Sequence, residues 1–431
     1  MANDRLSKSQ VDSLASALVD DRTSLESLAR TCLERCEVVA RMTEREGEIT
    51  RRFLTPPMRS VHQQLDTWAA EWGLDCRVDS LGNWLAKRPS SSPNAKTLLI
   101  GSHLDTVPNG GRFDGTLGVV MGLSVIEATR DLSLPFHLQV VGFSEEEGVR
   151  YALPYLGSRC LTGTFDSKWL DRFDDSNVSM RSAIESFGLS TRGIAEDHLP
   201  PDSVLAFVEP HIEQGPQLIQ AQCSVGLVTA IAGQSRMALK FTGMPGHAGT
   251  TPMDQRSDAL VAVARVVTEL TRYAENVEDL RFTFGRIEAQ PNARNVIAGV
   301  VHLTADVRHA DDRIRLDAVE YLKDYAEQVS RQSSVRFEIV EHVQQAAIAM
   351  DPSVQEALGQ AVLDSGLKSF ELSSGAGHDA AVMAEAFPTG MLFLRQPSPI
   401  SHHPDENVNE EDVADGIQVL INWVTRLAKE Q

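Results

Sequence analysis

The sequence lacks the features that mark membrane, secreted and nucleic-acid-binding proteins. No run approaches the about 18 consecutive apolar residues of a membrane span. The start, MANDRLSKSQ, has neither the basic nor the apolar region of a secretory signal. Lys and Arg number 40 against 60 Asp and Glu, so the net charge of −20 would repel a phosphate backbone. We therefore expect neither a membrane nor a nucleic acid as a partner.

Cysteine is also scarce. The five cysteines are an odd number spread over 431 residues, which argues against a disulfide framework. We interpret Cys32 and Cys36, one turn apart on an expected helix, as packed thiols. Free thiols suit a reducing compartment, so the sequence predicts a cytoplasmic protein.

The chain has the composition of a soluble globular protein, with 42% apolar and 23% charged residues. Its length predicts two to three domains. The first 75 residues are expected to be mostly helical, and short apolar runs then alternate with helical periodicity. This alternation predicts an α/β domain whose mostly parallel sheet carries helices on both faces. The apolar runs are residues 98–100, 139–143, 204–208 and 391–394.

A different pattern fills residues 222–340. Strands and helices are expected there in the order ββαββαβ, which suggests a small α+β satellite domain that acts as a lid or in dimerisation. We therefore expect residues 1–221 and 341–431 to form the catalytic domain, with 222–340 inserted into it. The expected strands are 225–231, 237–241, 281–287, 300–308 and 335–340, and the helices are 257–274 and 314–332.

Each apolar run of the first domain is followed by His or carboxylate side chains. Open α/β sheets place their functional sites at the carboxyl ends of strands. Imidazoles and carboxylates that converge there suit one or two divalent metal ions, and two ions need a bridging carboxylate. The groups are His103, Asp105 and Asp114 after the first run, Glu145, Glu146 and Glu147 after the second, Glu209, His211 and Glu213 after the third, and His402 and His403 after the fourth.

Seven ordered motifs carry a resemblance to a known family. The chain resembles the ureido-amidohydrolase branch of the dinuclear aminoacylase and carboxypeptidase-G-like metallopeptidase superfamily, which holds N-carbamoyl-L-amino acid hydrolases, allantoate amidohydrolases and some β-ureidopropionases. The resemblance runs from about residue 70 to the C-terminus and leaves the first 45 or so residues uncovered. The motifs are GSHLDTVPNGGRFDGTLGV, FSEEEGVRY, EPHIEQGP, GHAGTTPMDQRSDA, NVIAGVVHLTADVRH, SGAGHDAAV and ISHHPDE.

The resemblance implies two divalent metal ions per protomer, which N and O ligands would accept as Zn, Mn, Co or Ni. His103 and His211 would hold one ion, Glu147 and His402 the other, and Asp114 would bridge them. Asp105 would orient His103, and Glu146 would be the general base.

The residues themselves decide only part of this assignment. In an extended segment neighbouring side chains point to opposite faces, so Glu146 and Glu147 can serve different partners. This alternation places Glu145 and Glu147 on the same face, so it would equally let Glu145 replace Glu147. The resemblance decides between them. The S-H-x-P frame likewise favours His402 over His403.

The satellite domain contributes further implied roles. His247 would stabilise the oxyanion, in its own subunit or across a homodimer, although it could instead be a turn residue that caps local backbone. Asn295 and Arg308 would grip the substrate carboxylate, for which a guanidinium is suited. Without the resemblance Arg308 reads as a surface residue. Gln214 and His378 also match substrate-binding positions, and Arg256 matches either an active-site position or a structural ion pair.

These assignments predict a metal-dependent amidohydrolase. It would cleave the ureido C–N bond of N-carbamoyl-L-amino acid-like substrates and release ammonia and carbon dioxide. The alternatives are allantoate as the substrate of the same site, an aminoacylase or peptidase activity, which His211 argues against, and a binding protein without catalysis. One departure bears on substrate choice: Pro399 stands where the family usually has Gly before Ile-Ser-His, so the loop at 397–399 is shaped differently.

Overall fold

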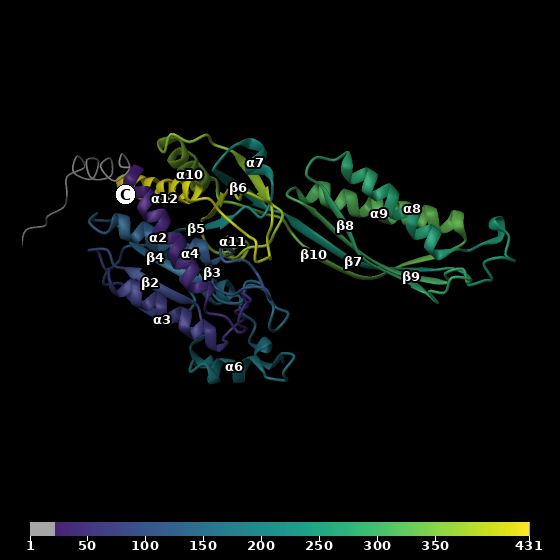
Figure 1. The fold of residues 1–431 in the computed structure, drawn as a ribbon, viewed down its shortest axis with the longest axis horizontal. Coiled ribbons are helices and arrows are strands. Elements are labelled where there is room, and N and C mark those ends of the chain that lie inside the picture. The colour runs from purple at the N-terminus through teal and green to yellow at the C-terminus, as the bar shows by residue number, and fades with distance from the viewer. Residues whose placement is uncertain (1–21, 431) are drawn as a thin grey trace, which may run out of the picture. The chain divides into compact units, whose positions relative to one another are not determined.

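The computed structural model describes residues 22–430 (Figure 1). Residues 1–21, which belong to the N-terminal stretch that the family resemblance does not cover, lie outside the described part. The described chain forms two compact units. The larger unit comprises residues 22–229, 350–372 and 378–430, and the smaller unit comprises residues 230–349 and 373–377. No described helix is both long and apolar enough to span a membrane.

The larger unit is built on a mixed sheet with a parallel centre. The strands follow the order β1-β2-β4-β3-β5-β13-β6-β11, and β12 pairs with β6. β4, β3, β5 and β13 run parallel, whereas the flanking pairs are antiparallel. The strands are β1 (Asp75–Val78), β2 (Trp84–Arg88), β3 (Thr97–His103), β4 (His137–Phe143), β5 (Val204–Ile212), β6 (Val225–Ile231), β11 (Ile348–Ala349), β12 (Glu371–Ser374) and β13 (Thr389–Leu394).

Both faces of this sheet are covered. Every residue of β4 and β13 is buried, although successive side chains point to opposite faces. The helix α4 (Thr116–Thr129) packs on β3, β4 and β5 and is covered in turn by α2 (Arg22–Ala40) and α12 (Glu410–Glu430). The α/β class with a parallel sheet centre is therefore confirmed. The remaining helices are α3 (Pro56–Ala70), α5 (Leu156–Leu161), α6 (Met180–Ser186), α7 (Gln217–Ala221), α10 (Pro352–Asp364) and α11 (Asp379–Met383).

The smaller unit is a four-stranded antiparallel sheet in the order β10-β7-β9-β8, with two helices packed on it (Figure 1). β9 alternates between buried and half-buried residues, as expected when helices cover one face. Asp258 and Asp311 cap the two helices by accepting hydrogen bonds from backbone N–H groups of the first turn. The elements are β7 (Gly233–Thr242), β8 (Arg281–Gln290), β9 (Val300–His309), β10 (Arg336–Gln345), α8 (Ala259–Glu275) and α9 (Asp312–Ser333).

One expected strand belongs to a different sheet. The sequence pattern placed residues 225–231 in the inserted α+β domain. In the structure these residues form β6, which pairs antiparallel with β13 of the larger sheet, Val225 opposite Leu394. The boundary between the two units lies within this strand, after Thr229. Local periodicity identifies a strand but carries no information about its partner, which explains the difference.

Candidate metal centre

The predicted metal ligands lie at or after the carboxyl ends of the four parallel strands. His103 is the last residue of β3 and lies in register with Phe143, the last residue of β4. His211 lies opposite Phe393, next to the end of β13. Because these strands are parallel, the segments that follow them begin at one edge of the sheet. This edge collects the imidazoles and carboxylates that the sequence placed after separate apolar runs.

The first cluster contains two buried histidines and Asp114. The Nε2 atoms of His103 and His211 lie 3.5 and 3.2 Å from Oδ1 of Asp114. The two Nε2 atoms are 3.5 Å apart. Two nitrogens bound to one tetrahedral zinc at about 2.1 Å each are separated by about 3.4 Å, so this spacing fits a shared cation.

The second cluster uses the other oxygen of Asp114. Nε2 of His402 lies 3.3 Å from Oδ2 of Asp114 and 3.4 Å from Oε1 of Glu147. The two oxygens of Asp114 therefore face two different ligand sets, which is the arrangement of a bridging carboxylate. His403 points elsewhere, since its Nδ1 accepts a hydrogen bond from the backbone N–H of Asp405.

Backbone carbonyls orient the two buried imidazoles. Nδ1 of His103 lies 2.9 Å from the carbonyl oxygen of Asp105, and Nδ1 of His211 lies 2.9 Å from that of Ile212. A proton on each Nδ1 donates to these carbonyls and leaves each Nε2 lone pair free for a cation. The carboxylate of Asp105 is farther from His103, at 3.8 Å.

The Asp105 carboxylate instead holds the glutamate loop. It accepts hydrogen bonds from the backbone N–H groups of Glu146 and Glu147, at 3.0 and 3.1 Å. Ligand atoms of His103, Glu146 and Glu147 lie within 4.8 Å of one another. Glu145 faces away, because its carboxylate accepts from the backbone N–H of Arg150 at 2.7 Å. The geometry thus brings Glu146 and Glu147, and not Glu145, to His103.

The electrostatics of the cluster favour a bound cation. Burial raises the pKa of Glu147 to about 8, and repulsion by Asp114 adds to the shift. Burial also raises the pKa of Glu146 well above its usual range. Burial opposes ionisation of Asp114 too, but the contacts of its carboxylate with His103 and His211 outweigh it and hold its pKa well below the usual range. Several carboxylates crowded in a buried site are stabilised by divalent cations, and the donor set fits such ions.

Comparisons with known proteins show the family of the chain. The model of peptidase family M20/M25/M40 matches residues 99–426. The chain belongs to this family. The N-carbamoyl-L-amino acid amidohydrolase of Geobacillus stearothermophilus is 33% identical over 89% of this chain and 94% of the relative. The allantoate amidohydrolase of Bacillus subtilis is 32% identical over 89% and 93%. A crystal structure of a hydantoinase/carbamoylase family amidase from Burkholderia ambifaria matches with a TM-score of 0.86 at 32% identity, over 93% of this chain and 97% of that one.

Membership of the M20 family makes the chain a metal-dependent hydrolase.

One supporting residue of the centre was not predicted from the sequence. Oε1 of the buried Glu406 accepts hydrogen bonds from the backbone N–H groups of Phe113 and Asp114, at 3.0 and 2.9 Å. A Cβ on Gly111 would lie 2.1 Å from Glu406, so this contact requires glycine there. Glu406 follows the two histidines in ISHHPDE, which was the available signal.

Two residues predicted to bind substrate also lie at the candidate metal centre of this hydrolase. Nε2 of Gln214 donates to Oδ2 of Asp114 at 3.3 Å and to Oγ of Ser401 at 2.7 Å. The ring of His378 is buried, with its centroid 4.5 Å from that of His211. Gln214 therefore connects Asp114 to the loop that carries His402.

The remaining predicted residues lie in the smaller unit of the hydrolase. His247 is exposed, and its Nδ1 accepts a hydrogen bond from the backbone N–H of Gly249. The backbone N–H of Ala248 donates to the carbonyl of Asn295, so His247 and Asn295 lie on adjoining segments. Arg256 donates to the carbonyl oxygens of Thr251 and Ala248 and forms no ion pair among the described residues.

Arg308 is engaged within the smaller unit. Its Nε and Nη2 donate to the two carboxylate oxygens of Asp306 at 2.9 and 3.0 Å, and its Nη1 donates to the carbonyl of Gly375 at 2.8 Å. A substrate carboxylate at this residue would have to share or displace the Asp306 contact.

Proposed function

We propose that the protein hydrolyses the ureido C–N bond of N-carbamoyl-L-amino acids with the help of two divalent metal ions. The observation that carries the proposal is the placement of Asp114 between two ligand sets. Its Oδ1 faces His103 and His211, and its Oδ2 faces His402. A single ion would leave one of these two ligand sets without a metal.

His103 and His211 would hold one ion, His402 and Glu147 the other, and Asp114 both. Zn, Mn, Co or Ni would suit these nitrogen and oxygen ligands. Bound divalent ions supply polarisation of the ureido carbonyl and a lowered pKa for an attacking water.

Glu146 is suited to proton transfer in this site. It lies beside His103 and Glu147, and its backbone is fixed by Asp105. In the proposed reaction its carboxylate accepts the proton of the attacking water and then delivers it to the leaving nitrogen, which departs as ammonia. The carbamate that remains loses carbon dioxide and leaves an amino acid.

The relatives support the substrate class. The curated proteins that match are named for N-carbamoyl-L-amino acids and for allantoate. Both compounds carry a carboxylate beside the ureido-bearing carbon. In our proposal Arg308 and Asn295 bind that carboxylate, and His247 stabilises the oxyanion.

An ammonia-release screen tests the proposal. Purified protein is stripped of metal, reloaded separately with Mn²⁺ or Zn²⁺, and supplied with several N-carbamoyl-L-amino acids, allantoate and N-acetyl-amino acids. We expect ammonia from N-carbamoyl-L-amino acids. Faster turnover of allantoate would identify allantoate as the substrate instead. Deacylation of N-acetyl-amino acids without ammonia release from any ureido compound would refute both ureido substrates. The Glu146→Gln variant is the control, because it keeps the shape of the site but cannot accept the proton.

We also propose a homodimer joined through the smaller unit, and residence in the cytoplasm. All five cysteines are free, and four of them are buried, which suits a reducing compartment. Light scattering at assay concentration tests the assembly, and a fully active monomer would refute the proposed homodimer.

Fractionation of the native host with an antibody to the chain tests the location, and recovery outside the cytoplasmic fraction would contradict the proposed residence in the cytoplasm.

A further inference from the structure

A buried arginine connects the chain segments on either side of the candidate metal centre. Arg51 is only 1% exposed and lies between α2 and α3, outside the residues that the family model matches. Its Nε donates to the carbonyl of Leu104 at 2.6 Å, and its Nη2 donates to Oγ1 of Thr116 at 3.1 Å. Leu104 directly follows His103, and Thr116 begins α4 two residues after Asp114.

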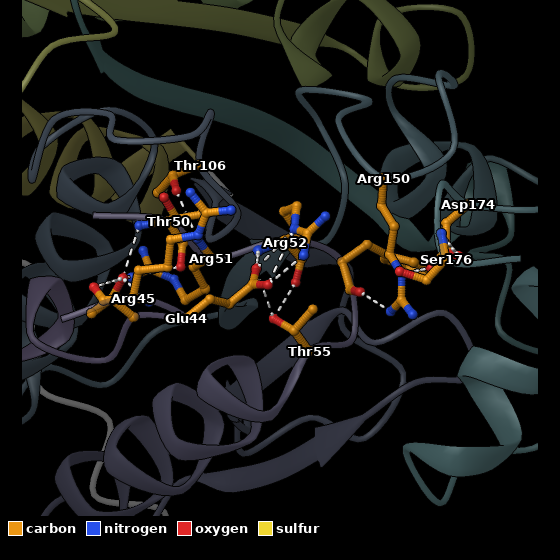
Figure 2. A network of polar contacts seen from close by, with 12 residues as sticks. Glu44, Arg45, Thr50, Arg51, Arg52, Thr55, Thr106, Arg150, Asp174 and Ser176 are labelled. Atoms are coloured by element: carbon orange, nitrogen blue, oxygen red, sulfur yellow. Dashed lines mark hydrogen bonds and ion pairs between the residues drawn. The ribbon is translucent and has the colours of Figure 1, made fainter. Parts of the chain in front are cut away.

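The rest of Arg51 anchors this fork. Its Nη1 donates to the carbonyls of Val39 and Met42 at the end of α2, at 3.2 and 3.3 Å. Its backbone N–H donates to Oγ1 of Thr106, and its carbonyl accepts from the backbone N–H of Thr106, at 2.9 and 3.0 Å (Figure 2). Arg51 is therefore held by the end of one helix while it grips both flanks of the loop from His103 to Asp114.

We propose that Arg51 is a positioning residue that sets the separation between His103 and Asp114 and thereby the affinity of the metal centre. This inference rests on the proposed metal-dependent function. The neighbouring segment supports the same loop, because the backbone N–H groups of Asn109 and Gly110 donate to Thr50 Oγ1 and the Ile49 carbonyl, at 2.9 and 2.8 Å. Residues 49–51 thus hold the loop along its length.

The planar fork of Arg51, and not its charge, explains its presence. The acceptors of its side-chain hydrogen bonds are carbonyls and a hydroxyl, and no carboxylate of the described chain forms an ion pair with it. Burial lowers the pKa of Arg51 to about 10, so the side chain is still cationic at neutral pH. A positive charge alone would repel a metal cation, whereas a rigid fork can bond two flanks of a loop at once.

The neighbouring Arg52 offers a matched control. Its guanidinium pairs with Glu44, with Nη2 2.6 Å from Oε2, and its side chain is 40% exposed (Figure 2). The test compares Arg51→Lys with Arg52→Lys, since both keep the charge and lose the fork. Metal-free proteins are titrated with Mn²⁺ in a calorimeter, and the melting temperature is recorded before and after saturation.

We expect Arg51→Lys to bind Mn²⁺ about 10- to 100-fold more weakly, the usual effect of losing a group that orients a ligand. Arg52→Lys should bind like the wild type. If Arg51→Lys melts earlier in the metal-free state but binds Mn²⁺ with wild-type affinity, its role is structural and the inference is overturned. A wild-type protein that binds no divalent ion would instead refute the metal centre itself.

A second variant covers the case in which Arg51→Lys does not fold. Thr116→Val keeps the shape of the side chain and removes only the hydroxyl that accepts from Arg51. We expect Mn²⁺ binding to weaken by about tenfold or more, the scale of one hydrogen bond to a charged group. Unchanged Mn²⁺ affinity in this variant would overturn the inference.

Discussion

Acidification should destabilise the larger unit through His62. This residue lies on α3, is only 4% exposed, and packs in a T-shaped arrangement against the Phe187 ring at a centroid distance of 5.8 Å. Its Nε2 has no hydrogen-bond partner among the described residues. Burial, with the positive charges of Arg59 and Arg51 adding to it, lowers the pKa of His62 from 6.5 to about 4.

The sign and size of the effect follow from linkage. Between the two pKa values the unfolded chain binds a proton that the native protein does not bind. The free energy of unfolding therefore falls as the pH drops from about 7 toward 4 and levels off below. At pH 5 the loss from His62 is about 2 kcal/mol, and below pH 4 it approaches about 3.4 kcal/mol, at 1.36 kcal/mol for each of about 2.5 pKa units.

Urea unfolding of metal-free protein at pH 8 and pH 5 measures this loss. The five tryptophans all belong to the larger unit, so their fluorescence reports its unfolding. In His62→Leu the titrating group is gone, whereas all other groups remain. The wild type should lose about 2 kcal/mol more than the variant between the two pH values. Equal losses in both proteins would refute the reasoning, because His62 would then titrate normally in the native state.

Three further predictions concern the site. Glu146→Gln should keep its metal and its melting temperature, while its kcat falls by about 100-fold or more. Glu147→Gln should instead weaken metal binding. A fully active Glu146→Gln variant would contradict the assignment of Glu146 as the general base. Asp114→Ala should lose at least one of two metal ions in elemental analysis, and retained full occupancy would refute the bridging role. Arg308→Ala should lower kcat/KM for a carbamoyl acid by about 10- to 150-fold, since a charged hydrogen bond contributes about 1.5–3 kcal/mol. A neutral amide substrate turned over as fast as the acid would contradict that role.

The location of the site could be predicted because it depends on a rule of topology. Parallel strands bring their carboxyl ends to one edge, so residues that follow separate apolar runs were expected to meet. His103, His211 and Asp114 meet in this way. The choice among adjacent glutamates could not be made from alternation alone. It depends on the hydrogen bonds of Asp105 to the loop and of Glu145 to Arg150, which no local pattern shows.

The supporting residues were harder to predict. Glu406 and Arg51 are charged residues in loops, where the usual expectation is exposure to solvent. Both are buried because they bond to backbone groups distant in sequence, Glu406 to residues 113 and 114 and Arg51 to Leu104. The pairing of β6 with β13 escaped prediction for the same reason. A sequence pattern describes neighbours along the chain, whereas these contacts join segments that are far apart in it.

Backbone conformation in the loops that follow the strands shows what the site requires beyond ligand identity. Glu145, Gln214 and His402 have φ values of 55°, 58° and 55°, in the left-handed region that favours glycine. Each such residue costs about 1 kcal/mol or more. Gln214 is held there because its backbone N–H donates to Oε1 of the buried Gln396 at 2.7 Å. A glycine at position 214 would relax the backbone but would remove the amide that contacts Asp114. The Gln214 side chain is thus retained although its left-handed backbone conformation costs free energy. A sequence search that identifies left-handed turns by glycine overlooks all three positions.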